Sequence, residues 1–433
     1  MRRLLALLLA LAAPAAWAHA IPDAAVFLDV EEGGVRAELH LPLSELEIGF
    51  GRDLLPGGER AVARYRSALA AYLAEHVGAV APDGRPWTVT VRSVGYHTEP
   101  TGTHIGDVEE AVAEVWLVPP DGAPVRRFTL LYDAVVHELI SHQALVSVRS
   151  DWAGGQVGGE PTFVGRADWK AQRIEIDRTE AGAWRGFRAS FALGVHHIAE
   201  GTDHLLFLLT LLLPAALVAV GGRWGAFVGW RRGLGRLLRI VTAFTVGHSL
   251  TLALGVLAGV TAPAGPVEVV IALSILVSAV HALRPLFPER EGLVAGLFGL
   301  VHGLAFAEIV AGFGVGPGQA ALTLLGFNLG IEAVQLAVVA VVAPVLFLLA
   351  RTALYAPVRV VGATVAGVAA LAWAAERALG WTNPVVLWVE QAAADALWLI
   401  VGLSVLAVGA TVWTRWRRHL EIARSARVAA ASS

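Results

Sequence analysis

The stretch Phe191-ALGVHHIAEGTDHLLFLLTLLLP-Ala215 opens an apolar run that is long enough to cross a membrane. Its head carries three histidines, one glutamate and one aspartate within nine positions, His196–His204. An ionisable side chain at bilayer depth costs about 3 kcal/mol or more unless it is paired, hydrated or bound to a metal. Five such residues together therefore indicate a functional site inside a membrane-spanning segment.

The composition narrows the chemistry that this site can use. The chain has 433 residues, 56% hydrophobic and 16% charged, and its formal net charge of -3 gives no basic surplus for binding nucleic acid. Cysteine is absent and the single methionine is Met1, which excludes disulfides and a copper path made of thiolates and thioethers. A bound metal must therefore accept imidazole and oxygen ligands.

The first residues have the pattern of a secretory signal peptide. The positive MRR precedes a short apolar run, and Ala16 and Ala18 flank a cleavage position after residue 18. The apolar run is short for a membrane span, which favours cleavage over an uncleaved anchor. Residues 19–186 are then predicted to form an exported, periplasmic domain.

This exported segment is predicted to be β-rich and sandwich-like, with one helix over 58–77. Alternating runs at 25–30 and 35–41 flank Glu-Gly-Gly, which is typical of a hairpin. Further strands are expected at 87–94, 113–118, 127–136 and 144–150. His137 and His142 are expected in a strand, where a spacing of five places them on opposite faces and makes them poor joint ligands.

Residues 187–414 are predicted to form a helical membrane domain, followed by a basic cytoplasmic tail over 415–433. Seven apolar segments are each close to the roughly 20 residues that a span requires. They cover 189–220, 237–260, 266–286, 292–313, 321–350, 356–378 and 394–414.

The arginines predict the orientation of these segments. If residues 19–186 lie outside, the predicted inner loops and the tail hold arginines, including Arg223, Arg284, Arg290, Arg351 and Arg415. The outer loops VTAPAGP and GFGVGPGQ hold no lysine or arginine. This pattern matches the positive-inside rule for a multi-pass protein of the bacterial inner membrane with a cytoplasmic C-terminus.

On an ideal first span, His197, Glu200 and His204 share one face, and His196, Glu200 and Asp203 form a neighbouring stripe. His197 and His204 would lie about 10 Å apart along a straight helix, too far to share one ion. Two alternatives follow. Either there are two metal stations, or the helix breaks at Gly201.

Later spans contribute further polar residues at similar depth. His248 and His302 lie near the middle of their spans, Asn328, Glu332 and Gln335 form one stripe, and Glu268 lies at the outer end of the third span. The predicted metal ligands are His197, Glu200, Asp203, His204, His248, His302 and Glu332. Additional candidates are His196, Asn328, Gln335 and Glu268.

Several of these segments resemble the HupE/UreJ family of membrane proteins. The resemblance rests on His197-IAEGT-Asp203-His204, Thr245-VGHSLTLAL, Val267-EVVIALSI, Phe298-GLVHGLAF and Phe327-NLGIEAVQ, and covers about 188–350. It implies a hydrogenase or urease accessory protein or a nickel permease, with His197, Asp203 and His204 in the metal-recognition signature. The second nickel-permease motif, F-H-G-x-A-H-G-x-E, is only loosely matched at Phe298–Glu308, which puts nickel itself in question.

Three functions are compatible with these patterns. The first is a permease or delivery protein for a divalent metal ion, Ni²⁺, Co²⁺ or Zn²⁺, in the lipid bilayer, with metalloenzyme maturation proteins as partners. The second is an intramembrane zinc hydrolase, with Glu200 or Glu332 as general base. The third is a periplasmic sensor or assembly domain on a membrane anchor, which leaves the polar spans unexplained.

Overall fold

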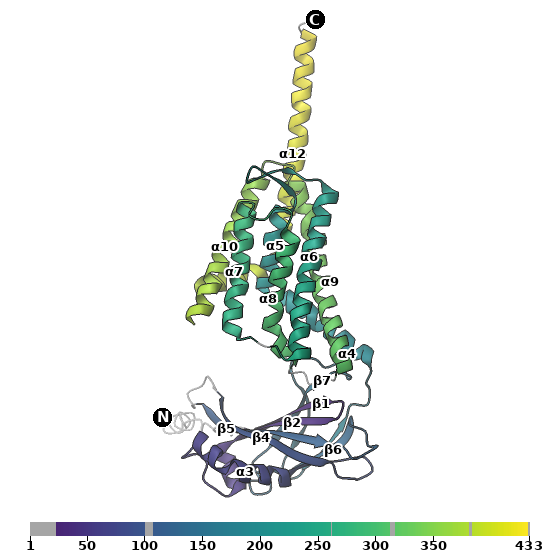
Figure 1. Ribbon diagram of the computed structural model, residues 1–433, viewed down its shortest axis with the longest axis vertical. Coiled ribbons are helices and arrows are strands. Elements are labelled where there is room, and N and C mark those ends of the chain that lie inside the picture. Colours follow the sequence, from purple (N-terminus) through teal and green to yellow (C-terminus); the bar gives the residue numbers. More distant parts are fainter. Residues whose placement is uncertain (1–22, 100–106, 261, 312–316, 381–382, 432–433) are drawn as a thin grey trace, which may run out of the picture. The chain divides into compact units, whose positions relative to one another are not determined.

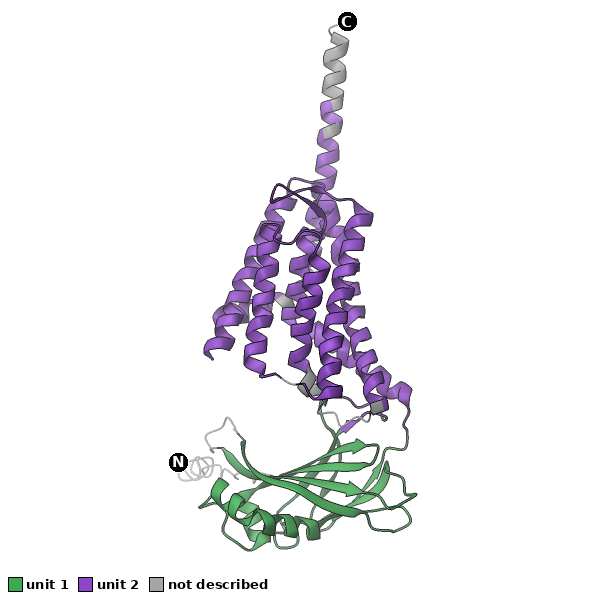
Figure 2. Ribbon diagram, in the orientation of Figure 1, with its two compact units in different colours: residues 1–149, 160–179 green, residues 150–159, 180–433 purple. Residues whose placement is uncertain are grey.

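The computed structural model describes residues 23–99, 107–260, 262–311, 317–380 and 383–431 (Figure 1). The chain divides into two compact units, one made of residues 1–149 and 160–179 and the other of residues 150–159 and 180–433 (Figure 2). The expected signal peptide over 1–18 lies outside the described residues.

The first unit is β-rich, as predicted, and its described residues form two sheets and two helices. The larger sheet has the strand order β4-β5-β2-β1-β7-β8, and the smaller has the order β3-β6-β9. The strands are β1 (Ala24–Glu31), β2 (Gly34–Pro42), β3 (Val77–Val80), β4 (Thr88–Glu99), β5 (Val108–Val118), β6 (Arg127–Tyr132), β7 (Ala144–Asp151), β8 (Thr162–Ala167) and β9 (Arg173–Asp177). The helices are α2 (Leu43–Phe50) and α3 (Glu59–His76).

The predicted hairpin over β1 and β2 shows how the sequence builds this core. The two strands pair antiparallel from Ala25 opposite His40 to Glu31 opposite Gly34. Along β2 the buried residues are Val35, Ala37, Leu39 and Leu41, because side chains alternate between the two faces of a strand. These apolar residues join one core with residues of the smaller sheet and of α3.

The opposite face of the same strands carries a network of charges. Arg149 donates to both carboxylate oxygens of Asp29, at 3.1 and 2.6 Å, and to Glu38 at 3.0 Å. His40 contacts Glu110 at 2.9 Å and Glu38 at 3.0 Å. These hydrogen bonds, first to Glu110 and then to Glu38, raise the pKa of His40 to about 9.

The raised pKa of His40 makes the stability of this unit depend on pH. Protonated His40 contributes fully below its ordinary pKa of 6.5, and its contribution is lost as the pH rises through about 9. We expect His40→Gln to lower the free energy of unfolding by about 1–2 kcal/mol near pH 6, a value reduced for partial solvent screening. The difference should disappear near pH 10, which thermal unfolding of the full chain at both pH values measures. A deficit that stays constant with pH contradicts this account.

The strand expected over 127–136 ends early, and the expectation for the two following histidines is wrong. β6 stops at Tyr132, His137 lies in a turn, and His142 lies in the irregular segment just before β7. Val135 adopts a left-handed conformation, φ 65°, which a continuing strand cannot accommodate. His142 is buried and its Nδ1 bonds to the carboxylate of Glu45, whereas His137 stacks on His76 at 4.2 Å.

The second unit is built mainly of apolar helices, as predicted. Among the described residues, five helices are long and apolar enough to cross a membrane, the bent pair of α4 and α5 adds a sixth candidate span, and α8 holds a shorter apolar segment. The helices are α4 (Ala183–Glu200), α5 (Thr202–Ala215), α6 (Trp230–Ala258), α7 (Ala264–Leu283), α8 (Glu291–Ala311), α9 (Pro317–Leu349), α10 (Tyr355–Leu379), α11 (Pro384–Ala394) and α12 (Ala396–Ala431). A small hairpin of β10 (Leu217–Val220) and β11 (Arg223–Phe227) precedes α6.

Glycines let the helices of this unit approach very closely. A Cβ atom on Gly194 of α4 would lie 2.0 Å from the carbonyl oxygen of Phe327 on α9. A Cβ atom on Gly247 of α6 would lie 2.1 Å from the carbonyl oxygen of Gly296 on α8. Small residues are the usual means of close helix packing in membranes. Because Gly194 precedes His197 by one turn and Gly247 adjoins His248, this packing also positions the histidines.

Candidate functional site

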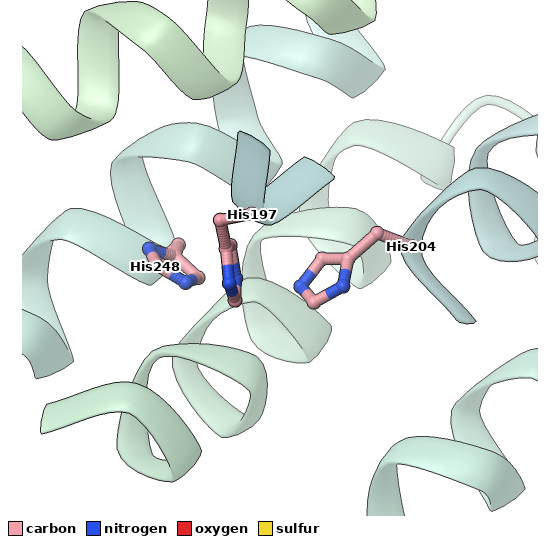
Figure 3. Close-up of side chains that lie close together, drawn as sticks. All are labelled: His197, His204 and His248. Carbon is pink, nitrogen blue, oxygen red and sulfur yellow. The ribbon is translucent and has the colours of Figure 1, made fainter. Parts of the chain in front are cut away.

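Three histidines from three helices meet inside the second unit. His197 lies near the end of α4, His204 near the start of α5, and His248 within α6 (Figure 3). One ring nitrogen of each lies within 4.8 Å of those of the other two. The ring centroids are 4.8 Å apart for His197 and His204, and 6.0 Å apart for His197 and His248.

A break at Gly201 makes this meeting possible. The axes of α4 and α5 differ by 70°, so the first span is bent and not straight. The break is the second of the two alternatives considered above, and it brings His197 and His204 far closer than the roughly 10 Å of a continuous helix. A Cβ atom at position 201 would lie 2.6 Å from the carbonyl oxygen of His197 and 2.9 Å from Nδ1 of His204. The bend is therefore packed too tightly to accept a side chain.

Hydrogen bonds fix which nitrogen of two rings carries the proton. Nδ1 of His204 lies 2.9 Å from a carboxylate oxygen of Asp203, and Nδ1 of His248 lies 3.4 Å from Oδ1 of Asn328. The amide nitrogen of Asn328 donates to the Leu324 carbonyl at 2.8 Å, which leaves its oxygen free to accept. Both Nδ1 atoms therefore donate, and the lone pair of each ring resides on Nε2.

These Nε2 atoms lack any hydrogen-bonding partner. The Nε2 atoms of His197, His204 and His248 are all buried and unsatisfied within the part of the chain that the structure describes. Buried polar atoms without partners are rare in folded proteins, so each calls for an explanation. Three histidines that each carry such a nitrogen, and whose ring nitrogens approach within 4.8 Å of one another, form a set of donors suited to a metal ion.

A fourth histidine, His302 of α8, lies beside this group. Its ring centroid is 4.8 Å from that of His204. Its Nε2 lies 3.2 Å from the hydroxyl of Ser274, which itself donates to the Ile271 carbonyl at 2.7 Å. Because the hydroxyl proton is already used, His302 Nε2 donates and its Nδ1 carries the lone pair. This Nδ1 is likewise buried and without a partner among the described residues.

A cavity of about 330 Å³ gives access to the histidines, with room for several water molecules. It is lined by His197, His204 and His302 at its buried side and by Glu200, Asp203 and Glu268, among others. The buried rings of Phe207 and Phe244 pack against His302, with ring centroids 5.5 and 5.1 Å away.

The remaining predicted ligands lie elsewhere or serve as supports. Glu332 accepts a hydrogen bond from Thr242 at 2.9 Å, Gln335 lies 3.3 Å from the Thr245 hydroxyl, and neither lines the cavity. They share a stripe with Asn328, but four and seven residues displace them by roughly 6 and 10 Å along α9. His196 and Glu200 are exposed, and their side chains pair at 3.4 Å. Of these two residues, Glu200 lines the cavity and His196 does not.

Two residues of this site were not anticipated. Ser274 orients His302; it lies in a polar stripe with Ser278 and His281, but a serine in a span usually serves helix packing, so the sequence assigned it no role. Arg377 lines the cavity and pairs with Glu268 at 3.1 Å. The sequence did contain a signal for Arg377. It lies at the predicted outer end of its span, where the positive-inside rule expects few arginines.

Comparison with known proteins finds a family similarity in this part of the chain. Residues 172–377 match the family model described as HupE / UreJ protein, a range that includes all four clustered histidines. No curated protein and no solved structure matches the chain.

Proposed function

Because residues 172–377 form a HupE/UreJ domain, we propose that the helical unit binds a divalent transition-metal ion through His197, His204 and His248 and moves it across or out of the membrane. The ion is the cargo of the protein. His302 and the carboxylates of Asp203 and Glu200 stand along its path. The specific role that we propose is that of a permease or a metal-delivery accessory protein.

The observation that carries this proposal is the convergence of buried nitrogens without partners. Nitrogens that share one ion at bonds of about 2.1 Å lie roughly 3 to 4.2 Å apart. The three histidine nitrogens lie within 4.8 Å of one another, so small side-chain rotations bring them to that separation. The Asp203–His204 hydrogen bond has the form of a carboxylate that orients a metal-binding imidazole.

The kind of metal follows from the ligands that the chain offers. With no cysteine and Met1 as the one methionine, the donors are imidazole nitrogens and carboxylate oxygens. Such donors suit nickel, cobalt and zinc. Nickel or cobalt is the assignment that agrees with the HupE/UreJ match, and metalloenzyme maturation proteins are the partners it suggests.

The orientation that we propose has seven spans, formed by the α4–α5 pair and by α6, α7, α8, α9, α10 and α12. The connections after α5, α7 and α9 contain Arg223, Arg284, Arg290 and Arg351, whereas those after α6, α8 and α10 contain no lysine or arginine. By the positive-inside rule the first set faces the cytoplasm, together with the tail after residue 414. Residues 19–186 are then periplasmic, after removal of residues 1–18 as a signal peptide.

One observation favours a second candidate, an intramembrane metal-dependent hydrolase. Glu200 lines the same cavity as His197 and His204, where a carboxylate near a metal-bound water serves as general base. In that case the bound ion is zinc, which holds the reactive water at an open coordination position.

Metal content tests the proposal. Tag-free protein purified in detergent and supplied with equal Ni²⁺, Co²⁺ and Zn²⁺ is expected to retain about one ion per chain, nickel or cobalt ahead of zinc. Mass spectrometry of the dialysed protein measures this, and zinc alone supports the hydrolase. Two results together contradict the proposal. They are purified protein that retains no metal, and nickel and cobalt uptake by cells that is unchanged when the gene for this protein is deleted.

A further inference from the structure

An ion pair stands in the wall of the cavity that leads to the histidines. Nε of Arg377, on α10, lies 3.1 Å from a carboxylate oxygen of Glu268, on α7. Both residues line the main cavity, and both line a smaller adjoining pocket that also includes Asp203. The pair joins two helices at the place where they border the route to the site.

Exposure shows that this pair lies at the mouth of the cavity. The side chains of Glu268 and Arg377 are 45% and 32% exposed, whereas that of His204 is 7% exposed. His302 is almost fully buried. A cation that enters from solvent therefore meets Glu268 before it meets the imidazoles.

Arg377 has one charged partner within the described residues, which is Glu268. Its neighbour Glu376 is engaged elsewhere, because its carboxylate accepts the backbone N–H of Asn383 at 3.1 Å. Half-exposed ion pairs contribute little net stability, since water competes for both partners. The pair therefore opens at low cost when a competing cation arrives.

The charges around the cavity are unbalanced. Glu200, Asp203 and Glu268 supply three carboxylates, and Arg377 is the one arginine or lysine among the residues that line it. Asp203 is already bonded to His204, so Glu268 and Glu200 are the carboxylates nearest to solvent. The guanidinium of Arg377 pairs with one of these two carboxylates, that of Glu268.

We propose that Arg377 is a tethered cation at the cavity mouth, and that a divalent metal ion gains access to the histidines by displacing it from Glu268. The arginine thus acts as a built-in competitor that sets how strongly the cavity attracts cations. This role rests on the proposed metal function, but its electrostatic basis is measurable without any metal.

The absence of cysteine allows a direct measurement. Ala305→Cys introduces one thiol in the lining of the cavity, and the purified full chain is then treated with a positively charged methanethiosulfonate reagent. In this background Arg377→Gln is expected to accelerate modification roughly five-fold, because a repelling charge is gone. Glu268→Gln is expected to slow it by a similar factor, because it leaves Arg377 unpaired.

The controls separate electrostatics from a change in shape. The negatively charged sulfonate reagent should show the opposite order of rates, and Arg377→Lys should react like the parent. Ser93→Cys, exposed in the β-rich unit, should react equally in all backgrounds.

If Arg377→Gln and Glu268→Gln change the rate with the cationic reagent in the same direction, the pair only holds α7 and α10 together, and the proposal is overturned. Equal rates in all variants overturn it too. If metal binding fails while the opposite shifts appear, the proposed function fails and the electrostatic role of Arg377 stands.

Discussion

His197→Gln is expected to lower the affinity for the bound metal ion by on the order of 100-fold or more, whereas His196→Gln leaves it unchanged. Loss of a residue that only supports a ligand typically costs 10–100-fold, and His197 is assigned as a ligand itself. Its Nε2 is buried and unpartnered among the described residues, and one of its ring nitrogens lies within 4.8 Å of ring nitrogens of His204 and His248. Calorimetric titration of the purified variants with Ni²⁺ and Co²⁺ measures the change.

The adjacent His196 is a closely matched control. Its side chain is 71% exposed and pairs with Glu200, and it does not belong to the group of three. Both substitutions remove one imidazole from the same turn of α4. Equal losses of affinity in the two variants, or none in either, contradict the assignment of His197 as a ligand.

Gly247→Ala is expected to lower the free energy of unfolding of the helical unit by about 3 kcal/mol, because overpacking at a rigid contact is costly. The added Cβ would lie 2.1 Å from the carbonyl oxygen of Gly296 and 3.0 Å from the backbone nitrogen of Leu300. Backbone atoms cannot rotate away as a side chain does, so α6 and α8 must separate. Such a change corresponds to a fall in Tm of roughly 5–10 °C.

Gly235→Ala, on the same helix, is the matched control for this prediction. A Cβ at position 235 meets nothing within 4 Å, so the substitution is expected to be neutral or to add up to about 1 kcal/mol through helix propensity. Thermal unfolding in detergent measures both variants. Because α6 carries His248 and α8 carries His302, Gly247→Ala should also weaken metal binding. Equal stability of the two variants contradicts the packing account.

Periodicity predicted the elements better than it predicted their ends. The hairpin of β1 and β2, helix α3 and the apolar helices all appear where alternation and hydropathy placed them. The strand over 127–136 stopped at Tyr132, because the left-handed backbone at Val135 is a local property that apolar composition does not reveal. Likewise the first apolar run ends as a helix at Ala215, and its last residues belong to the hairpin of β10 and β11.

The sequence singled out the four histidines of the candidate site, but it did not show their geometry, and the predicted ligand Glu332 lies away from the cavity. Ionisable side chains at bilayer depth drew attention to His197, His204, His248 and His302, which the structure places side by side. Whether the first span breaks at Gly201 depends on tertiary packing. The sequence therefore did not decide between one metal site at a break and two metal sites on a straight helix. The pairing of Glu268 with Arg377 spans two helices far apart in the chain, and no local pattern encodes such a contact.

X-ray absorption at the metal edge tests the central claim most directly, because multiple scattering from imidazole rings reports how many histidines hold the ion. The tag-free protein loaded with one equivalent of Ni²⁺ or Co²⁺ is expected to show three or four imidazole ligands, with oxygen completing the shell and no sulfur. His248→Gln should remove one of these imidazoles. A spectrum of oxygen ligands alone, or one unchanged by His248→Gln, contradicts a metal site built from His197, His204 and His248.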